Sequence, residues 1–143
     1  MSSATSSIPN RGRPAITVVA AVIQREGHIL IGQRQKGEWH QYKWEFPGGK
    51  MEPAETPQDA LRRELREELD IEAEIGDEIT RYEYQYPGKP LIHLIFFRVP
   101  HFTGEPRSLA FEEIRWEEPK RFPDYDFLDG DIDFVGRIVR GQL

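Results

Sequence analysis

The chain has 143 residues, carries a formal net charge of −6 at neutral pH and contains no cysteine. Its length fits one domain with a hydrophobic core, and the lack of cysteine excludes disulfide and thiolate chemistry. The negative charge argues against nonspecific binding to a nucleic-acid polymer, and no apolar run suits a membrane span or a secretion signal. We therefore expect a soluble cytoplasmic protein with a disordered tail at residues 1–14 and one folded domain at residues 15–143.

The first part of the domain predicts two paired strands. Residues 16–24 form a nearly continuous β-branched and alanine-rich run, which is typical of a strand buried on both faces. A turn at residues 25–27 leads to residues 28–34, which we expect to form a hairpin with the first strand. Residues 35–43 are polar and predict a loop, and residues 44–46 predict a short extended piece before a Pro-Gly-Gly sequence.

The next element is predicted to be a helix that begins directly after Thr56. Thr56 suits the N-cap, Pro57 suits the first helical position, and Asp59 provides a short form of the capping box. Leucines then recur every four residues, which predicts that they face the core. These leucines are Leu61, Leu65 and Leu69.

The second half of the domain predicts more strands and a final helix. Residues 74–85 and 91–98 have the composition of strands, and a Pro-Gly turn lies between them. Residues 101–111 predict a loop, residues 114–117 a short strand, and residues 131–140 a closing helix with an apolar face. Because strands and helices mix without strict alternation, we predict an α/β fold in which a mixed sheet lies between helices, an α/β/α sandwich.

Three glutamates of the predicted helix, Glu64, Glu67 and Glu68, lie at positions i, i+3 and i+4. This spacing places their carboxylates on one side of a helical turn, where like charges destabilise by roughly a few tenths of a kcal/mol per pair. A bound divalent cation would turn this repulsion into attraction, because hard ions such as Mg²⁺ prefer oxygen ligands. A solvated acidic helix face, with partners such as Arg63 and Glu67, is the alternative explanation.

The segment at residues 49–71 resembles the Nudix box, in which a glycine, a glutamate and an Arg-Glu and Glu-Glu pattern occur at fixed spacing. The matching positions are Gly49, Glu55, Arg63, Glu64, Leu65, Glu67, Glu68 and Ile71. Asp70 stands where the family has a glycine. Because this position follows the helix and needs a positive φ, which Asp tolerates, we regard the departure as mild. The resemblance implies the same α/β/α sandwich.

Proteins of this family hydrolyse a phosphoanhydride bond in a nucleoside diphosphate linked to another group. The resemblance implies Mg²⁺ as cofactor, with Mn²⁺ as a substitute, to stabilise phosphoryl charge and activate water. The implied metal ligands are Gly48, Glu64, Glu67 and Glu68. One of these glutamates would also act as general base, while Glu55 and Arg63 would form an ion pair that braces the loop on the helix.

The family usually adds a fourth acid from a loop beyond the central strands. Ala110 occupies the position six residues before Trp116 where this acid is expected. We therefore assign the catalytic role to Glu112, with Glu113 close behind in the same segment. A surface acidic pair explains these two residues equally well.

Further stretches resemble the MutT-like branch of the family, which cleaves nucleoside triphosphates to the monophosphate and pyrophosphate. They are residues 29–34, 44–50, 104–106 and 128–134. The resemblance implies that Arg34, at the end of a strand, binds substrate phosphate and that Lys50, next to the two glycines, neutralises phosphate charge. A solvated strand end is the alternative for Arg34.

Candidates for contact with the base are three aromatic residues and an aspartate. Phe46, Tyr82 and Phe96 could stack on a base, although aromatic residues in strands usually belong to the core. Asp131 lies at the start of the last predicted helix, and when ionised it would only accept hydrogen bonds, for example from cytosine N4. A plain helix N-cap is the alternative for Asp131.

The leading hypothesis is a Mg²⁺-dependent nucleoside triphosphate pyrophosphohydrolase that acts on oxidised or modified nucleotides or on a cytosine nucleotide. A related enzyme hypothesis changes the substrate to ADP-ribose, a nucleotide sugar or a dinucleoside polyphosphate. A nonenzymatic nucleotide-binding sensor is the alternative of another class, which the presence of all three box glutamates disfavours. We expect a small-molecule nucleotide as partner, no nucleic-acid polymer and no membrane, and a monomer or homodimer.

Overall fold

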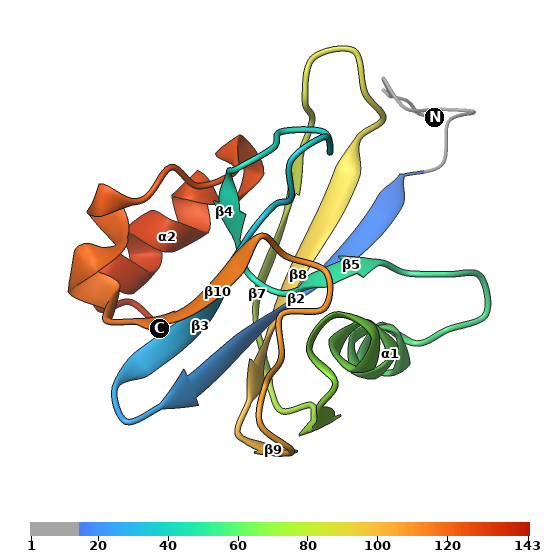
Figure 1. Ribbon diagram of the computed structural model, residues 1–143. Coiled ribbons are helices and arrows are strands. Elements are labelled where there is room, and N and C mark those ends of the chain that lie inside the picture. The colour runs from blue at the N-terminus through green and yellow to red at the C-terminus, as the bar shows by residue number, and fades with distance from the viewer. Residues whose placement is uncertain (1–14) are drawn as a thin grey trace.

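The computed structural model describes residues 15–143, and the tail predicted at residues 1–14 lies outside this part. A mixed sheet of seven strands forms its centre (Figure 1). The main path of the sheet runs β10 (Glu113–Glu117), β3 (His28–Gln33), β2 (Ile16–Arg25), β8 (Ile92–Val99) and β7 (Glu78–Tyr84). Two short strands lie off this path, since β4 (Trp44–Glu45) pairs with β3 and β5 (Gly48–Lys50) pairs with β2.

Strand β2 lies in the middle of the sheet, which explains its apolar sequence. It pairs in parallel with β8 along eight consecutive residues and pairs antiparallel with β3 and β5. Residues 19–23 are each at most 5% exposed, so side chains on both faces of the strand are buried. The structure confirms the buried strand that the continuous apolar run predicts.

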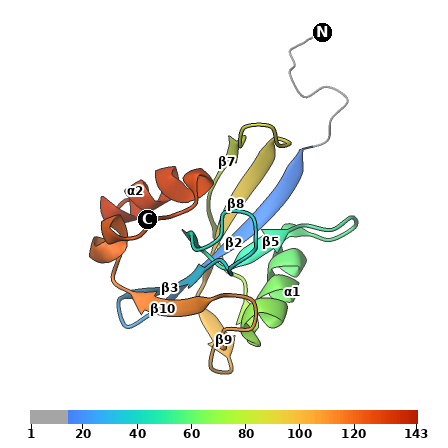
Figure 2. The same ribbon diagram turned by 45° about the horizontal axis from the view of Figure 1, so that its top comes forward.

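Two hydrophobic clusters cover the two faces of the sheet, each beneath one helix. The buried leucines of α1 (Pro57–Leu69) pack in a cluster that includes Phe97. On the other face, α2 (Ile132–Val139) packs Phe134 in a cluster that includes Phe96. The two helices lie on opposite sides of the sheet in both views (Figures 1 and 2), which confirms the α/β/α sandwich. No helix in the described part of the chain is long and apolar enough to cross a membrane.

Local signals fix both ends of α1. The Thr56 hydroxyl accepts a hydrogen bond from the Asp59 backbone nitrogen at 3.1 Å, and Pro57 occupies the first turn, as the sequence predicts. The helix ends at Asp70, which has a φ of 57° and donates its backbone N–H to the Arg66 carbonyl. This left-handed conformation explains why the family's glycine position accepts an aspartate here.

The segments that follow α1 differ from the prediction. The strand expected at residues 74–85 is divided, because β6 (Glu72–Glu74) ends early and β7 begins at Glu78. The partner of β6 is β9 (His101–Thr103), which lies inside the stretch predicted as a loop. The loop prediction is wrong there, because such short strands form through pairing with a distant segment, which local sequence does not specify.

The chain reaches α2 through two 3₁₀ turns, η1 (Pro119–Asp124) and η2 (Asp129–Asp131). The helix begins at Ile132, one residue later than predicted, and the Asp131 side chain makes no capping hydrogen bond. Asp131 therefore occupies the N-cap position that the alternative assigns to it, but its carboxyl does not cap the helix.

We predict that Thr56→Ala lowers the free energy of unfolding by about 1 kcal/mol, because the Asp59 backbone nitrogen loses its side-chain partner. Urea denaturation followed by circular dichroism measures the difference. Thr103→Ala, at an exposed position of β9, is the control and should change stability by less than about 0.5 kcal/mol. Equal unfolding midpoints for Thr56→Ala and the wild type would show that α1 does not depend on this cap.

Candidate active site

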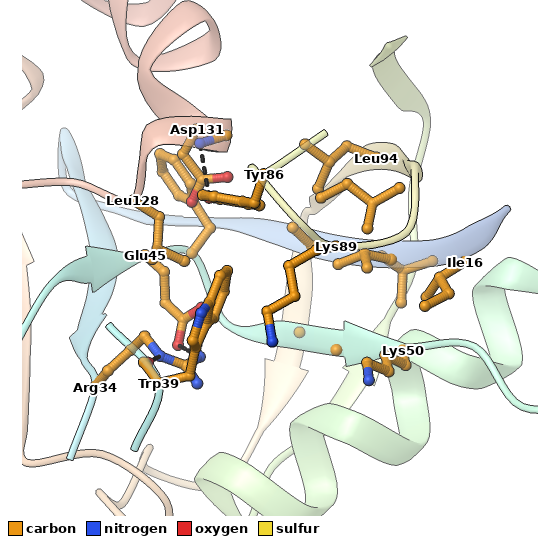
Figure 3. A pocket seen from close by; sticks show the side chains of 18 of the residues that line it. Ile16, Arg34, Trp39, Glu45, Lys50, Tyr86, Lys89, Leu94, Leu128 and Asp131 are labelled. Carbon is orange, nitrogen blue, oxygen red and sulfur yellow. Dashed lines mark hydrogen bonds and ion pairs between the residues drawn. The ribbon is translucent and has the colours of Figure 1, made fainter. Parts of the chain in front are cut away.

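A cavity of about 440 Å³ lies beside β2 and β5 and receives side chains from several separate segments of the chain (Figure 3). The four residues predicted to bind substrate all line it: Arg34, Phe46, Lys50 and Asp131. Gly48 and Glu68, from the predicted metal site, line the same cavity. The fold therefore gathers distant parts of the sequence around one space.

Two glycines lie where β5 passes between β2 and α1. Gly48 has a φ of 153°, and a side chain there would overlap the Val19 carbonyl oxygen. A Cβ atom at Gly49 would lie 2.5 Å from the carboxylate carbon of Glu64. This close approach places the backbone directly against the carboxylates, and Gly48 donates its N–H to Glu68 at 3.0 Å.

Burial and mutual repulsion perturb the carboxylates beside this turn. Burial, followed by the charges of Glu45 and Glu64, raises the pKa of Glu68 to about 9. Burial also raises the pKa of Glu64, although the neighbouring Arg63 opposes this shift. Without a bound cation, Glu68 is therefore protonated near neutral pH.

Arg63 is a shared counterion of the acidic cluster. It donates two hydrogen bonds to Glu55, at 2.7 and 3.0 Å, which agrees with the predicted ion pair. It also contacts Glu64 at 3.2 Å and Glu67 at 3.3 Å. The Glu67 side chain is 59% exposed and therefore lies on the solvent side of the cluster.

The donor set suits a hard divalent cation. The pKa values of Glu64 and Glu68 are raised, which shows that nearby positive charge does not compensate these partly buried carboxylates. Carboxylate oxygens are also the ligands that Mg²⁺ prefers. Across residues 15–143, no three acidic or histidine side chains are already arranged around one ion.

Asp131 is a buried acid in the same cavity, with only 6% of its surface exposed. Burial raises its pKa well above the ordinary value, the charge of Glu45 adds to this effect, and a backbone hydrogen bond from Phe46 opposes it. A neutral carboxyl both donates and accepts hydrogen bonds. Burial therefore favours the neutral form of Asp131, in contrast to the expected ionised side chain that can only accept.

Two tyrosines hold the segment that precedes Asp131. The Tyr82 hydroxyl donates to the Gly130 carbonyl at 2.7 Å, and the Gly130 N–H donates to the Tyr86 hydroxyl at 2.8 Å. Tyr82, a predicted stacking residue, thus positions this segment instead. Tyr86 lines the cavity and was missed by the sequence analysis.

The other two stacking candidates belong to the aromatic core next to α2. Phe46 is 3% exposed and stacks on Phe127, with 5.7 Å between ring centroids. Phe96 is fully buried and stacks on Phe134 at 4.0 Å. Stacking on a base is therefore wrong for Phe96, because the core uses its ring, whereas Phe46 contributes to the cavity wall.

Arg34 reaches the cavity but already has partners within the protein. Its Nε donates to the Trp39 carbonyl at 2.7 Å, and its Nη1 pairs with Glu45 at 3.2 Å. Burial raises the pKa of Glu45 to about 7, although Arg34 opposes the shift. Lys50 is exposed at the end of β5 (Figure 3). Contact of Arg34 and Lys50 with phosphate remains a prediction.

In the part of the chain that the structure describes, neither candidate for the fourth acid lines the cavity. The exposed Glu112 accepts a hydrogen bond from the Lys36 backbone nitrogen at 3.5 Å, and Glu113 pairs with Arg115. Glu45 lines the cavity instead, and its charge acts on Glu68. This acid is not among the predicted site residues, although it stands directly before the Phe-Pro-Gly-Gly sequence.

Two further cavity residues, Trp39 and Lys89, come from connecting segments. Trp39 lies in the loop between β3 and β4, and Lys89 lies in the turn between β7 and β8. The available sequence signal for Trp39 was a large aromatic residue inside an otherwise polar loop. Lys89 carried no signal, because a lysine in an exposed turn is common.

Comparisons with known proteins agree with the geometry. A family model described as the NUDIX domain matches residues 13–135. The CTP pyrophosphohydrolase of Escherichia coli is 40% identical over 117 residues, which cover 82% of this chain and 86% of that protein. The 8-oxo-dGTP diphosphatase of Haemophilus influenzae is 34% identical over 125 residues, which cover 87% of this chain and 91% of that protein.

Solved structures share the fold. The solution structure of the E. coli ORF135 protein has a TM-score of 0.82 and 36% identity, and the match covers 92% of this chain and 94% of that one. The crystal structure of the MutT protein from Methanosarcina mazei has a TM-score of 0.80 at 24% identity, over 94% of this chain and 98% of that one. The family model, the sequence relatives and the shared fold together show that the chain belongs to the Nudix hydrolase family.

Proposed function

We propose that this chain is a metal-dependent pyrophosphohydrolase that cleaves a nucleoside triphosphate to the monophosphate and pyrophosphate. The observation that carries this proposal is the single cavity that joins Gly48 and Glu68 to the buried Asp131. The cavity thus connects a site suited to cleavage of a phosphoanhydride bond with a site that can recognise a base. The names of the two relatives, a CTP pyrophosphohydrolase and an 8-oxo-dGTP diphosphatase, support a nucleoside triphosphate as the substrate class.

The metal end of the site is formed by the acidic cluster and the Gly-Gly turn. The residues that would hold Mg²⁺, or Mn²⁺ in its place, are Gly48 through its carbonyl, Glu64, Glu67 and Glu68. When bound, the ion supplies charge neutralisation at the phosphoryl oxygens and an activated water. Arg63 holds Glu64 and Glu67 in place, and the Gly48 N–H holds Glu68.

The phosphate chain would be held by Arg34 and Lys50, two of the cations that line the cavity. Arg34 has five N–H donors, and its contacts with Trp39 and Glu45 leave some of them for a ligand. Lys50 directly follows Gly49 and is exposed to an entering phosphate. Both side chains line the cavity that contains Glu68.

The base would be read by Asp131 in its neutral form. A neutral carboxyl matches an edge that presents an acceptor beside a donor, as cytosine does with N3 and its N4 amino group. Thymine presents the same groups in the reverse order, so a carboxyl held in one orientation distinguishes the two. We therefore favour cytosine nucleotides, and the name of the second relative adds an oxidised guanine nucleotide as a candidate.

A hydrolysis panel tests the proposed function. The protein with Mg²⁺ is given CTP, dCTP, 8-oxo-dGTP, dTTP and ADP-ribose, and the products are identified by chromatography. Release of a nucleoside monophosphate and pyrophosphate is the expected result. Preferential cleavage of ADP-ribose would favour the alternative substrate class, and binding without cleavage of any compound would favour a sensor.

We predict that activity requires Mg²⁺ or Mn²⁺ and that Glu67→Gln and Glu68→Gln each reduce kcat by roughly a hundredfold or more. The reason is the loss of a main electrostatic stabiliser of phosphoryl charge. Circular dichroism should show an intact fold, since the changes relieve repulsion between like charges. Full activity in EDTA, or in the double variant, would contradict the assignment of the metal site.

The same assay decides the fourth acid. Glu45→Gln and Glu112→Gln are compared under saturating Mg²⁺. We expect the larger loss of kcat for Glu45→Gln, because Glu45 lines the cavity and its charge acts on Glu68. The reverse order would restore Glu112 as the catalytic acid.

We predict that, without divalent cations, the free energy of unfolding falls as pH rises from about 5 to 9. The pKa of Glu68 is raised from 4.5 to about 9 in the folded protein. Between these values the folded state retains a proton that the unfolded chain has released, so a higher pH favours unfolding. Urea denaturation in EDTA at several pH values measures the slope, and Glu68→Gln should flatten it. Identical slopes for the two proteins would show that Glu68 is not perturbed in this way.

We predict that Asp131→Ala narrows the preference between cytosine and thymine nucleotides by roughly tenfold, because a buried hydrogen-bonding group is removed. The ratio of kcat/KM for dCTP and dTTP measures the effect. Asp131→Asn, which still donates and accepts, should keep the preference better than alanine does. The control is Asp133→Ala, whose exposed side chain pairs with Arg137. An unchanged ranking in Asp131→Ala would show that the base is read elsewhere.

A further inference from the structure

Trp39 lines the cavity, but the roles proposed for the metal end and for Asp131 do not involve it. Its large apolar side chain is 45% exposed, although it lines the cavity. In Figure 3 the indole stands between Arg34 and Lys89. Aromatic surface at a concave site is typical of a contact with a ligand. We therefore expect the exposed indole to contact a ligand that can pack against a flat ring.

The loop that carries Trp39 is held at its base. The Arg34 backbone N–H donates to the Lys43 carbonyl at 2.8 Å, and the Tyr42 N–H donates to the Arg34 carbonyl at 2.9 Å. The Arg34 side chain then donates to the Trp39 carbonyl at 2.7 Å. The Trp39 backbone is thus placed before any ligand enters, which reduces the ordering entropy lost on binding.

The surroundings of the indole suit a nucleotide. Tyr86 packs edge-to-face against it, with 4.7 Å between centroids and an interplanar angle of 81°. The Lys89 ammonium and the Arg34 guanidinium lie 5.9 and 6.0 Å from its centroid. Tyr86 is anchored to Gly130, directly before Asp131. A flat ring on Trp39 would therefore lie near the segment that carries Asp131, and the cations would attract an attached phosphate chain.

We propose that Trp39 is the platform on which the base of the substrate stacks. The inference rests on the proposed function, since it takes a nucleoside triphosphate as the ligand. Stacking tolerates different bases, because every base has a π face. Trp39 therefore determines that a base is bound, whereas Asp131 determines which base is preferred.

Kinetics of a small set of variants test this role. Trp39→Leu should raise KM about tenfold for every nucleoside triphosphate that the wild type cleaves and leave kcat nearly unchanged. Trp39→Phe keeps a flat ring and should largely restore KM. The matched control is Tyr42→Leu, because Tyr42 lies on the same loop, is 42% exposed and does not line the cavity. Inhibition by inorganic triphosphate, which has no base, should be the same in Trp39→Leu and the wild type.

Fluorescence provides a readout that does not need turnover. The α,β-methylene analogue of CTP cannot be cleaved at the bond concerned, and its binding should quench the emission of a stacked indole. The wild type and Tyr42→Leu should show this quenching. Trp39→Phe should lose it, although Trp44 and Trp116 remain in that variant.

An unchanged KM in Trp39→Leu, a matching rise in the inhibition constant of inorganic triphosphate, or persistent quenching in Trp39→Phe would each overturn the proposal. Failure of the proposed function gives a different pattern. In that case the wild type would cleave no nucleoside triphosphate of the panel, while quenching by the analogue that depends on Trp39 would still support base stacking.

Discussion

The site depends on the close contact between the Gly48-Gly49 backbone and the carboxylates of α1. β5 pairs with β2 on one side, and on the other side a Cβ atom at Gly49 would lie 2.5 Å from the Glu64 carboxylate. A side chain at Gly49 would require the Glu64 carboxylate to move, and the peptide N–H of Gly48 donates directly to Glu68. The Thr56 cap and the buried leucines hold the helix in the position that this contact requires. The packing of β5 against α1 and the arrangement of the carboxylates therefore depend on the same contact.

The same contact places several acidic groups close together, where burial and mutual repulsion destabilise their charged forms. Glu45, Glu64 and Glu68 all have raised pKa values, with burial as the first cause in each case. Arg63 carries one positive charge and pairs with several carboxylates, so it cannot neutralise all of them. Such a cluster is relieved either by taking up protons or by binding a cation. Nudix hydrolases generally use a divalent metal, and this charge imbalance is the physical reason why the acids of this chain suit one.

Local signals were sufficient for the elements that hold the metal end. The Thr56 and Pro57 start signals and the leucine period predicted α1, and the continuous apolar run predicted β2. Pairing between distant segments is not predictable in the same way, which is why the local sequence of β9 (His101–Thr103) predicts a loop. Short strands of this kind depend on the rest of the fold more than on their own residues.

The residues of the base end were harder to predict, because burial decides their roles. Phe96 and Tyr82 carry the same aromatic signal as Trp39, but the core uses the first ring and Gly130 uses the hydroxyl of the second. Burial within the cavity favours the neutral form of Asp131, which the sequence pattern alone does not indicate. The sequence gives the chemical type of each side chain, whereas the fold determines which part of that side chain remains accessible to a ligand.

The two ends of the cavity are held by different elements, which has a consequence for specificity. α1 and β5 position the acids, while the base end is built from the segment before α2, the β7–β8 turn and the loop that carries Trp39. Tyr82 and Tyr86 fix Gly130 through their hydroxyl groups. Arg34 connects the two ends, since it binds both the Trp39 carbonyl and Glu45. Under the proposed function, we therefore expect substitutions at the base end to change which nucleotide is preferred and to leave the phosphoanhydride chemistry in place, except where they act through Arg34.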